Sequence, residues 1–246
     1  MVYDTNSFFR GVRMADESTL PRGVRALWHG PETGRRGPKP TTSVQEIAEH
    51  AIALADAEGL EAASLAAVAS RLGLTTMSLY RYVDSRDDLR AVMVDVAMGP
   101  LTLTRRSWRR RLEEWAHADF AQLMAHPWIL DVHDPEPPVG PNMLAWTDAG
   151  MGVLLDAGLD PQTASSSLLA VDGLARHSAQ IVRQYSVSGA DAAWANRLRE
   201  VVDADRLPAL HAVLTAGALE DEDGLETDLD VGLGLLLDGI AARLER

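Results

Sequence analysis

The chain has 246 residues, a formal net charge of −13 and no cysteine. The lack of cysteine excludes a disulfide framework, a thiolate nucleophile and a cysteine-ligated zinc site, and no apolar run reaches the ~20 residues that a membrane-spanning helix needs. The N-terminus has no apolar segment behind a basic start, so no secretory signal is expected and the sequence predicts a cytoplasmic protein that does not bind membranes.

The charge is distributed unevenly along the chain. Residues 1–40 carry seven Arg or Lys against four Asp or Glu, whereas residues 41–99 carry four against nine. An acidic protein is repelled by nucleic acid, so the total charge argues against DNA as a partner. Only the N-terminal segment has the cationic character that phosphate binding requires.

Residues 1–41 are predicted to form a flexible basic arm, because glycine and proline interrupt every periodic pattern except a short helical turn at residues 24–28. The arm ends in GRRGPKP, whose prolines prevent a helix. This cationic end either lies along a DNA groove or is a solvated linker. Its candidate DNA-binding residues are Arg35, Arg36 and Lys39.

An amphipathic helix is predicted over residues 43–57. Ser43 and Glu46 have the spacing of a capping box at its start, and Gly59 follows its end. Its apolar residues recur at helical spacing, which predicts one buried face.

The segment 64–83 has the spacing of a helix-turn-helix. Ser64 is placed to cap a first helix over residues 65–72, and Gly73 stands where the chain turns sharply. Thr75 then caps a second helix that runs to about Val83.

The second of these helices has a buried face and an exposed polar face. Leu79 and Val83, four residues apart, point back at the first helix. Arginine can donate two hydrogen bonds to guanine, methyl groups can contact thymine, and hydroxyls can reach bases or phosphates, so the exposed face can read DNA. The residues of this face are Thr76, Met77, Ser78, Tyr80 and Arg81.

A further helix is predicted from Arg86 to residue 98. Ser85 and Asp88 form its capping pair, and Gly99 with Pro100 ends it. Arg86, in the first turn, is placed to reach a phosphate.

These elements together resemble the N-terminal domain of the tetracycline-repressor (TetR) family of transcriptional regulators. The resemblance rests on RRGPKP, SVQEIAEHAIALADAEG, SLAAVASRLGLTTMSLYRYV and SRDDL, and the run LYRYV before a polar turn is its most specific part. It implies an all-α fold, with a three-helix DNA-binding domain at residues 42–99.

The resemblance also implies roles for individual residues. It places Thr76, Met77, Ser78 and Arg81 against bases. It places Ser64, Tyr80, Tyr82 and Arg86 against phosphate or sugar, and Thr75 is counted with them as the cap of the DNA-reading helix. Tyr82 lies nearer the Leu79 face, so packing is an equal alternative for it. Ala66 and Ala67 stand where the family often has basic or polar residues, so base contacts from the first helix are not expected.

Residues 100–246 are predicted to form a larger, all-helical effector-binding and dimerisation domain. The sequence HPW, a Pro-rich loop and then GPN resemble the tetracycline-repressor-like C-terminal domain. The last helix is apolar around most of its circumference, which indicates that a second subunit covers it. Helices are expected over residues 105–125, 142–158, 161–185, 192–203, 207–216 and 229–244.

An effector pocket in this domain is expected to combine aromatic and thioether walls with a few polar groups. The candidates are His117, Phe120, Met124, Trp128, Met143, Trp146, Asp172 and His177. His177 interrupts an apolar stripe, which fits either a ligand contact or a histidine with a local partner. His117 also fits a surface position, and Asp172 is spaced to pair with Arg176.

The sequence shows no catalytic constellation: GxSxG, a Walker loop and a GxGxxG after a strand are all absent. No His spacing on a helix suits a metal, and no cofactor is expected. The sequence therefore predicts a dimeric repressor that binds a palindromic operator and is released by a small, lipophilic or aromatic effector. An activator, a regulator controlled by a partner protein, and an all-helical enzyme are the alternatives.

Overall fold

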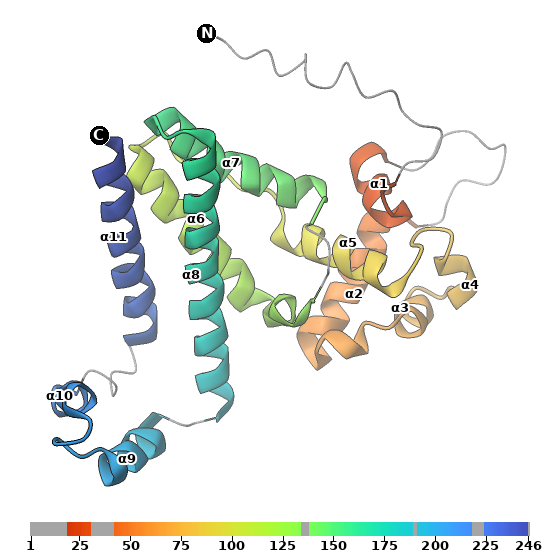
Figure 1. Cartoon of the computed structure of the whole chain (residues 1–246). Coiled ribbons are helices and arrows are strands. Elements are labelled where there is room, and N and C mark those ends of the chain that lie inside the picture. Colours follow the sequence, from red (N-terminus) through yellow and green to blue (C-terminus); the bar gives the residue numbers. More distant parts are fainter. Residues whose placement is uncertain (1–18, 31–41, 134–137, 189–190, 218–223, 246) are drawn as a thin grey trace.

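The computed structural model describes residues 19–30, 42–133, 138–188, 191–217 and 224–245, and all regular structure in these ranges is helical (Figure 1). The all-α prediction is therefore confirmed. The predicted arm residues Arg35, Arg36 and Lys39 lie outside the described residues. Within the described ranges, no helix combines the length and apolar character needed to cross a bilayer.

Among the described residues, six helical elements form the N-terminal domain. The elements are α1 (Arg22–His29), α2 (Val44–Glu58), η2 (Leu60–Ala62), α3 (Leu65–Arg71), α4 (Thr76–Leu79) and α5 (Arg86–Met98). The side chains of Ser43, Ser64, Thr75 and Ser85 each accept a hydrogen bond from a first-turn amide, as their sequence positions predict. The four helix starts are thus fixed by local side chains.

The core of this domain lies between α2 and α5, with α3 and α4 on one side (Figure 1). Ile47, Val68, Leu79 and Leu89 are fully buried there. Burial of one such aliphatic side chain contributes roughly 1.5–3 kcal/mol to folding.

Two details of the N-terminal domain differ from the sequence predictions. The segment expected to contain only a short helical turn forms the eight-residue helix α1, which packs on α5. The predicted DNA-reading helix ends as an α-helix at Leu79 instead of Val83, and residues 80–83 continue as hydrogen-bonded turns.

The C-terminal domain is a bundle with two protruding helices (Figure 1). Helices α6, α7, α8 and α11 pack on one another, whereas α9 and α10 extend beyond the end of α8. The elements are α6 (Trp108–Ala125), η3 (Pro127–Asp131), α7 (Pro141–Ala157), α8 (Pro161–Ser188), α9 (Asp191–Val201), α10 (Pro208–Thr215) and α11 (Gly224–Leu244).

Polar contacts of Asp56 and Asp95 join the N-terminal and C-terminal domains. Asp56, at the end of α2, accepts a hydrogen bond from Trp128 Nε1 at 2.7 Å, and its carboxylate lies 2.8 Å from His126 Nδ1. On α5, Asp95 accepts hydrogen bonds from the Met143 amide at 2.9 Å and from Asn142 Nδ2 at 3.1 Å. Burial raises the pKa of Asp95, and the hydrogen bonds from α7 oppose that shift. The start of α7 is therefore held directly by α5 of the N-terminal domain.

Candidate nucleic-acid interface and effector domain

Helix α4 presents the predicted DNA-reading face. Met77 is 78% exposed, Tyr80 and Arg81 are also exposed, and Leu79 and Val83 are fully buried on the opposite side. The Thr75 hydroxyl accepts a hydrogen bond from the Ser78 amide at 3.2 Å. Helix α4 and the turn that follows it are anchored by one buried face and display a thioether, a phenol and a guanidinium toward solvent, groups that can read a DNA major groove.

The remaining candidates near α4 are less accessible. Thr76 and Ser78 are half-buried, and the Ser78 hydroxyl lies 2.9 Å from the Thr75 hydroxyl. Tyr82 is partly buried and packs against the core, which favours the packing role for its ring. The Ser64 hydroxyl is engaged with the Ala67 amide at 3.2 Å.

Arg86 is held by an acidic neighbour from η2. Its Nη2 atom lies 2.5 Å from Glu61 Oε2, and Arg90 reaches the other carboxylate oxygen at 3.0 Å. The Arg86 guanidinium, together with Arg90, lowers the pKa of Glu61. Contact of Arg86 with a phosphate would therefore replace an existing ion pair.

The predicted effector-pocket residues fall into buried and exposed groups. Trp146 and Trp128 are buried; Trp146 Nε1 donates to the Gly99 carbonyl at 2.8 Å. Phe120, Met124 and Met143 are half-buried against the core. All five of these apolar candidates therefore contribute to the hydrophobic core.

The polar candidates lie closer to the surface. His117 is exposed, with Nε2 at 3.0 Å from Asp230, and His177 is exposed on α8. Asp172 pairs with Arg176 at 3.5 Å, which is the alternative that its helical spacing predicts. The apolar residues at helical spacing around His177, which are Ala170, Leu174 and Ile181, are themselves exposed or half-buried, so this stripe is not part of the core.

Asp119 is a buried acid that the sequence analysis missed. It is 2% exposed on α6, and its Oδ2 atom has no hydrogen-bond partner among the described residues. Burial, reinforced by repulsion from Asp172 and opposed by Arg176, raises its pKa to about 7. The position follows Trp115 and precedes Leu123 by four residues each, so helical spacing alone predicts that its side chain is buried.

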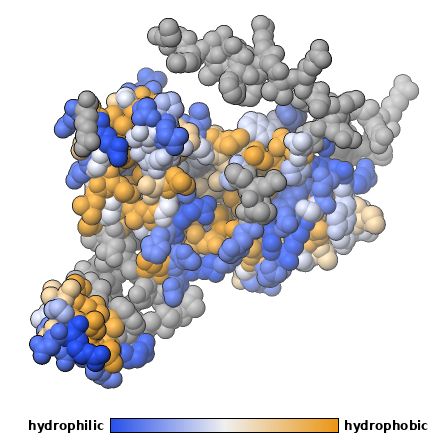
Figure 2. Space-filling model, in the orientation of Figure 1, coloured by the Kyte–Doolittle hydropathy of each residue, from blue (hydrophilic) through white to orange (hydrophobic). Residues whose placement is uncertain are grey.

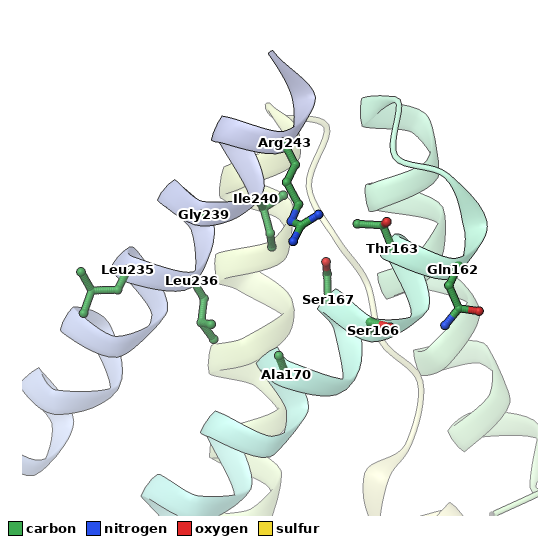
Figure 3. Close-up of a pocket in the computed structure, with 10 residues that line it drawn as sticks. All are labelled: Gln162, Thr163, Ser166, Ser167, Ala170, Leu235, Leu236, Gly239, Ile240 and Arg243. Carbon is green, nitrogen blue, oxygen red and sulfur yellow. The ribbon is translucent and has the colours of Figure 1, made fainter. Parts of the chain in front are cut away.

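An open groove of about 420 Å³ lies between α8 and α11 (Figure 3). Its walls combine Ser166, Ser167 and Ala170 with Leu235 and Ile240. None of the eight predicted pocket residues lines it. Apolar side chains also gather on the adjoining surface of α11 (Figure 2), where Leu235 is 70% exposed.

The arginines at the start of α6 do not form an open cationic patch. Arg109 lies 3.5 Å from Glu113, Arg110 lies 2.9 Å from the same residue, and Arg106 lies 3.9 Å from Glu114. The described residues contain no cluster of three or more His, Asp or Glu placed to hold a metal ion.

Two protein-family models match successive parts of the chain. Residues 47–93 match the family described as bacterial regulatory proteins, tetR family, and residues 100–244 match the tetracyclin repressor-like C-terminal domain. The HTH-type transcriptional repressor DrrR1 of Streptomyces coeruleorubidus is 33% identical, over 90% of this chain and 85% of that protein.

Solved structures share the fold. Apo ActR from Streptomyces coelicolor has a TM-score of 0.71 at 23% identity, covering 84% of this chain and 100% of that one. ActR in complex with actinorhodin matches with a TM-score of 0.70, over 84% of this chain and 100% of that one.

The two family matches, the likeness to DrrR1 and the exposed polar face of α4 agree. The predicted family is confirmed, and it is a family of regulators and not of enzymes. The chain belongs to the TetR family of bacterial transcriptional regulators, with a helix-turn-helix domain followed by a tetracycline-repressor-like helical domain.

Proposed function

We propose that the protein is a dimeric, ligand-responsive repressor that binds a palindromic operator in the cytoplasm. The observation that carries this proposal is the exposed face of α4, where Met77, Tyr80 and Arg81 project from a buried anchor. The 33% identity to a transcriptional repressor supports repression over activation.

Arg81 is proposed as the main base contact. Arg81→Ala is expected to weaken binding to the preferred operator by ~1–3 kcal/mol and to relax the sequence preference, because a bidentate contact to guanine is lost. The measurement is fluorescence anisotropy on a fragment that the wild-type protein selects from a random-sequence library. Arg71→Ala, an equal change of charge at the end of α3, serves as the control.

The two variants separate base reading from general electrostatics. Equal loss of affinity for selected and random DNA by Arg81→Ala would demote Arg81 to a phosphate contact. Failure of the wild-type protein to select any sequence would remove the operator proposal itself.

The outer face of α8 and α11 is proposed as the dimer interface. Leu169 is 71% exposed on α8, and Val231 and Leu235 are exposed on α11. The groove between the same two helices (Figure 3) gives this face a concave surface with a polar wall and an apolar wall. A two-fold axis through such a face would present two copies of α4 to a two-fold symmetric operator.

Leu235→Arg is expected to convert the dimer to a monomer at micromolar concentration, because it places a charge at the centre of an apolar contact. Sedimentation equilibrium measures the change in mass. Leu155→Arg, at an exposed leucine of α7, is the matched control and should leave the mass unchanged. A Leu235→Arg protein that remains dimeric would place the interface elsewhere.

Effector control is proposed to act as a shift between two conformations. The ligand would bind more tightly to the conformation in which the two DNA-reading helices are too widely spaced for the operator. The loss of operator affinity is then set by the ratio of the ligand's affinities for the two conformations. Asp119, with its unpartnered oxygen between α6 and α8, is a polar group that a hydrogen-bond donor on the ligand would satisfy. The contacts of Asp56 and Asp95 with the C-terminal domain are the connection through which α2 and α5 would move.

A thermal-shift screen with lipophilic and aromatic metabolites tests this part of the proposal. Ligand that binds only the folded protein raises the melting temperature. Stabilisation should be accompanied by loss of operator binding, and the absence of stabilisation by every compound class would favour control by a partner protein.

A further inference from the structure

Helix α1 lies outside the part of the chain that matches the TetR N-terminal domain, which begins at residue 47. It nevertheless packs on α5 and α2, and its own residue Val24 is buried in that contact. One end of α1 contacts the turn after the proposed DNA-reading helix, and the other end contacts the loop before α7.

The start of α1 is capped by a residue of α5. Asp88 accepts hydrogen bonds from the amides of Gly23 at 2.9 Å and Val24 at 3.3 Å. The same carboxylate accepts from the Asp84 amide at 2.8 Å. One buried carboxylate therefore fixes both α1 and the turn that follows α4.

Gly23 makes this close approach possible. A Cβ atom there would lie 2.8 Å from Val92 Cγ2 and 2.9 Å from Asp88 Oδ1. Any larger residue would push α1 away from α5. The first turn of α1 is thus fitted to α5 specifically.

Arg22 connects α1 to the end of the DNA-reading segment. Its Nη1 atom donates to the Tyr80 carbonyl at 2.7 Å, and its amide donates to Asp84 Oδ2 at 2.8 Å. Tyr80 is the C-cap of α4, where carbonyl groups lack partners within the helix. A cation at this end supplies both a donor and a favourable charge.

The other end of α1 reaches the effector domain. Trp28 Nε1 donates to the Val139 carbonyl at 2.8 Å. The next residue, Gly140, approaches Asp95 so closely that a Cβ there would lie 2.1 Å from Asp95 Oδ1. Trp28 therefore contacts the same short segment that Asp95 holds at the start of α7.

We propose that α1 is a positioning element that sets the C-terminal turn of the DNA-reading segment and ties it to the start of α7. Arg22 is the positioning residue at the first end and Trp28 at the second. Arg22 acts on DNA affinity through the Tyr80 carbonyl and does not itself contact phosphate. This inference rests on the proposed role of residues 76–81 in reading the operator.

Arg22→Ala in the full chain tests the first end. Binding to the operator fragment selected by the wild-type protein is expected to weaken roughly ten-fold, because a charged hydrogen bond to the α4 C-cap is lost. The slope of log affinity against log salt is expected to remain that of the wild type. His29→Ala, at the opposite end of the same helix, is the control and should retain wild-type affinity.

Two outcomes would overturn this role for Arg22. Unchanged affinity would show that the Tyr80 contact does not position the reading face, and a salt slope reduced by about one unit would show a direct phosphate contact. If the wild-type protein selects no DNA, the proposed function fails first, and the comparison of variants is not reached.

Trp28→Phe tests the second end without DNA or effector. The change removes the indole donor and keeps an aromatic ring. Hydrogen–deuterium exchange is expected to become faster at residues 138–144 and also at residues 80–84. Faster exchange at residues 138–144 alone would show that α1 does not connect the two places, and unchanged exchange at both would exclude Trp28 from the link.

Discussion

Replacing Asp119 by asparagine is expected to remove a pH-dependent loss of stability from the protein. The pKa of Asp119 is raised to about 7 in the folded protein, from an ordinary value of 3.8. Below pH 3.8 the carboxyl is neutral in both states and costs nothing. Between these values the unfolded chain ionises while the folded protein keeps its proton, so stability falls as pH rises toward 7.

Urea unfolding at fixed protein concentration, from pH 5 to pH 8, measures this effect. The stability of Asp119→Asn relative to wild type should grow by about 1.4 kcal/mol per pH unit up to pH 7 and then level off. Asp148→Asn, at an exposed position of α7, should follow the wild-type profile. Parallel profiles for wild type and Asp119→Asn would mean that Asp119 ionises without penalty.

Asp95→Ala is expected to destabilise the protein by about 2–4 kcal/mol, because it removes a buried carboxylate and leaves the Met143 amide without an acceptor. Asn142 Nδ2 loses the carboxylate but keeps the Asp95 backbone carbonyl as an acceptor. Denaturant unfolding measures the loss. Asp95→Asn, which keeps one side-chain acceptor in the same volume, should cost less.

Asp95→Ala should also loosen the contact between the two domains. Amide exchange at the start of α7 should become faster in Asp95→Ala, since the Met143 amide has lost its partner. A loss of stability below about 0.5 kcal/mol, within the range of ordinary surface changes, would show that the domain joint depends on Asp56 and α1 instead.

Much of the fold could be predicted from local sequence. Ser43, Ser64, Thr75 and Ser85 cap helices through amides three residues away, so each start is encoded in a few neighbouring residues. Helix α1 was underestimated for the opposite reason. Its cap is Asp88, which lies 65 residues from Gly23 in the sequence, so a pattern of neighbouring residues cannot reveal that contact.

The exposed face of residues 76–81 was easier to predict than the surroundings of Asp119 in the C-terminal domain. Met77 and Arg81 are exposed because Leu79 and Val83 of the same short segment are buried, and this division follows from helical spacing. The surroundings of Asp119 depend on Asp172 and Arg176 of α8. Spacing on α6 indicates that Asp119 is buried, but which residues of another helix face it depends on tertiary packing.

The ion pairs of Glu61 also bear on how this regulator searches the chromosome. Glu61 occupies the guanidinium groups of Arg86 and Arg90 in the absence of DNA. Because a phosphate must displace the Glu61 carboxylate from these guanidinium groups, the free energy gained on binding random-sequence DNA is smaller. Shorter binding at random sites reduces the time that a search along DNA takes, and a long-lived complex would then depend on the proposed base contacts of residues 76–81.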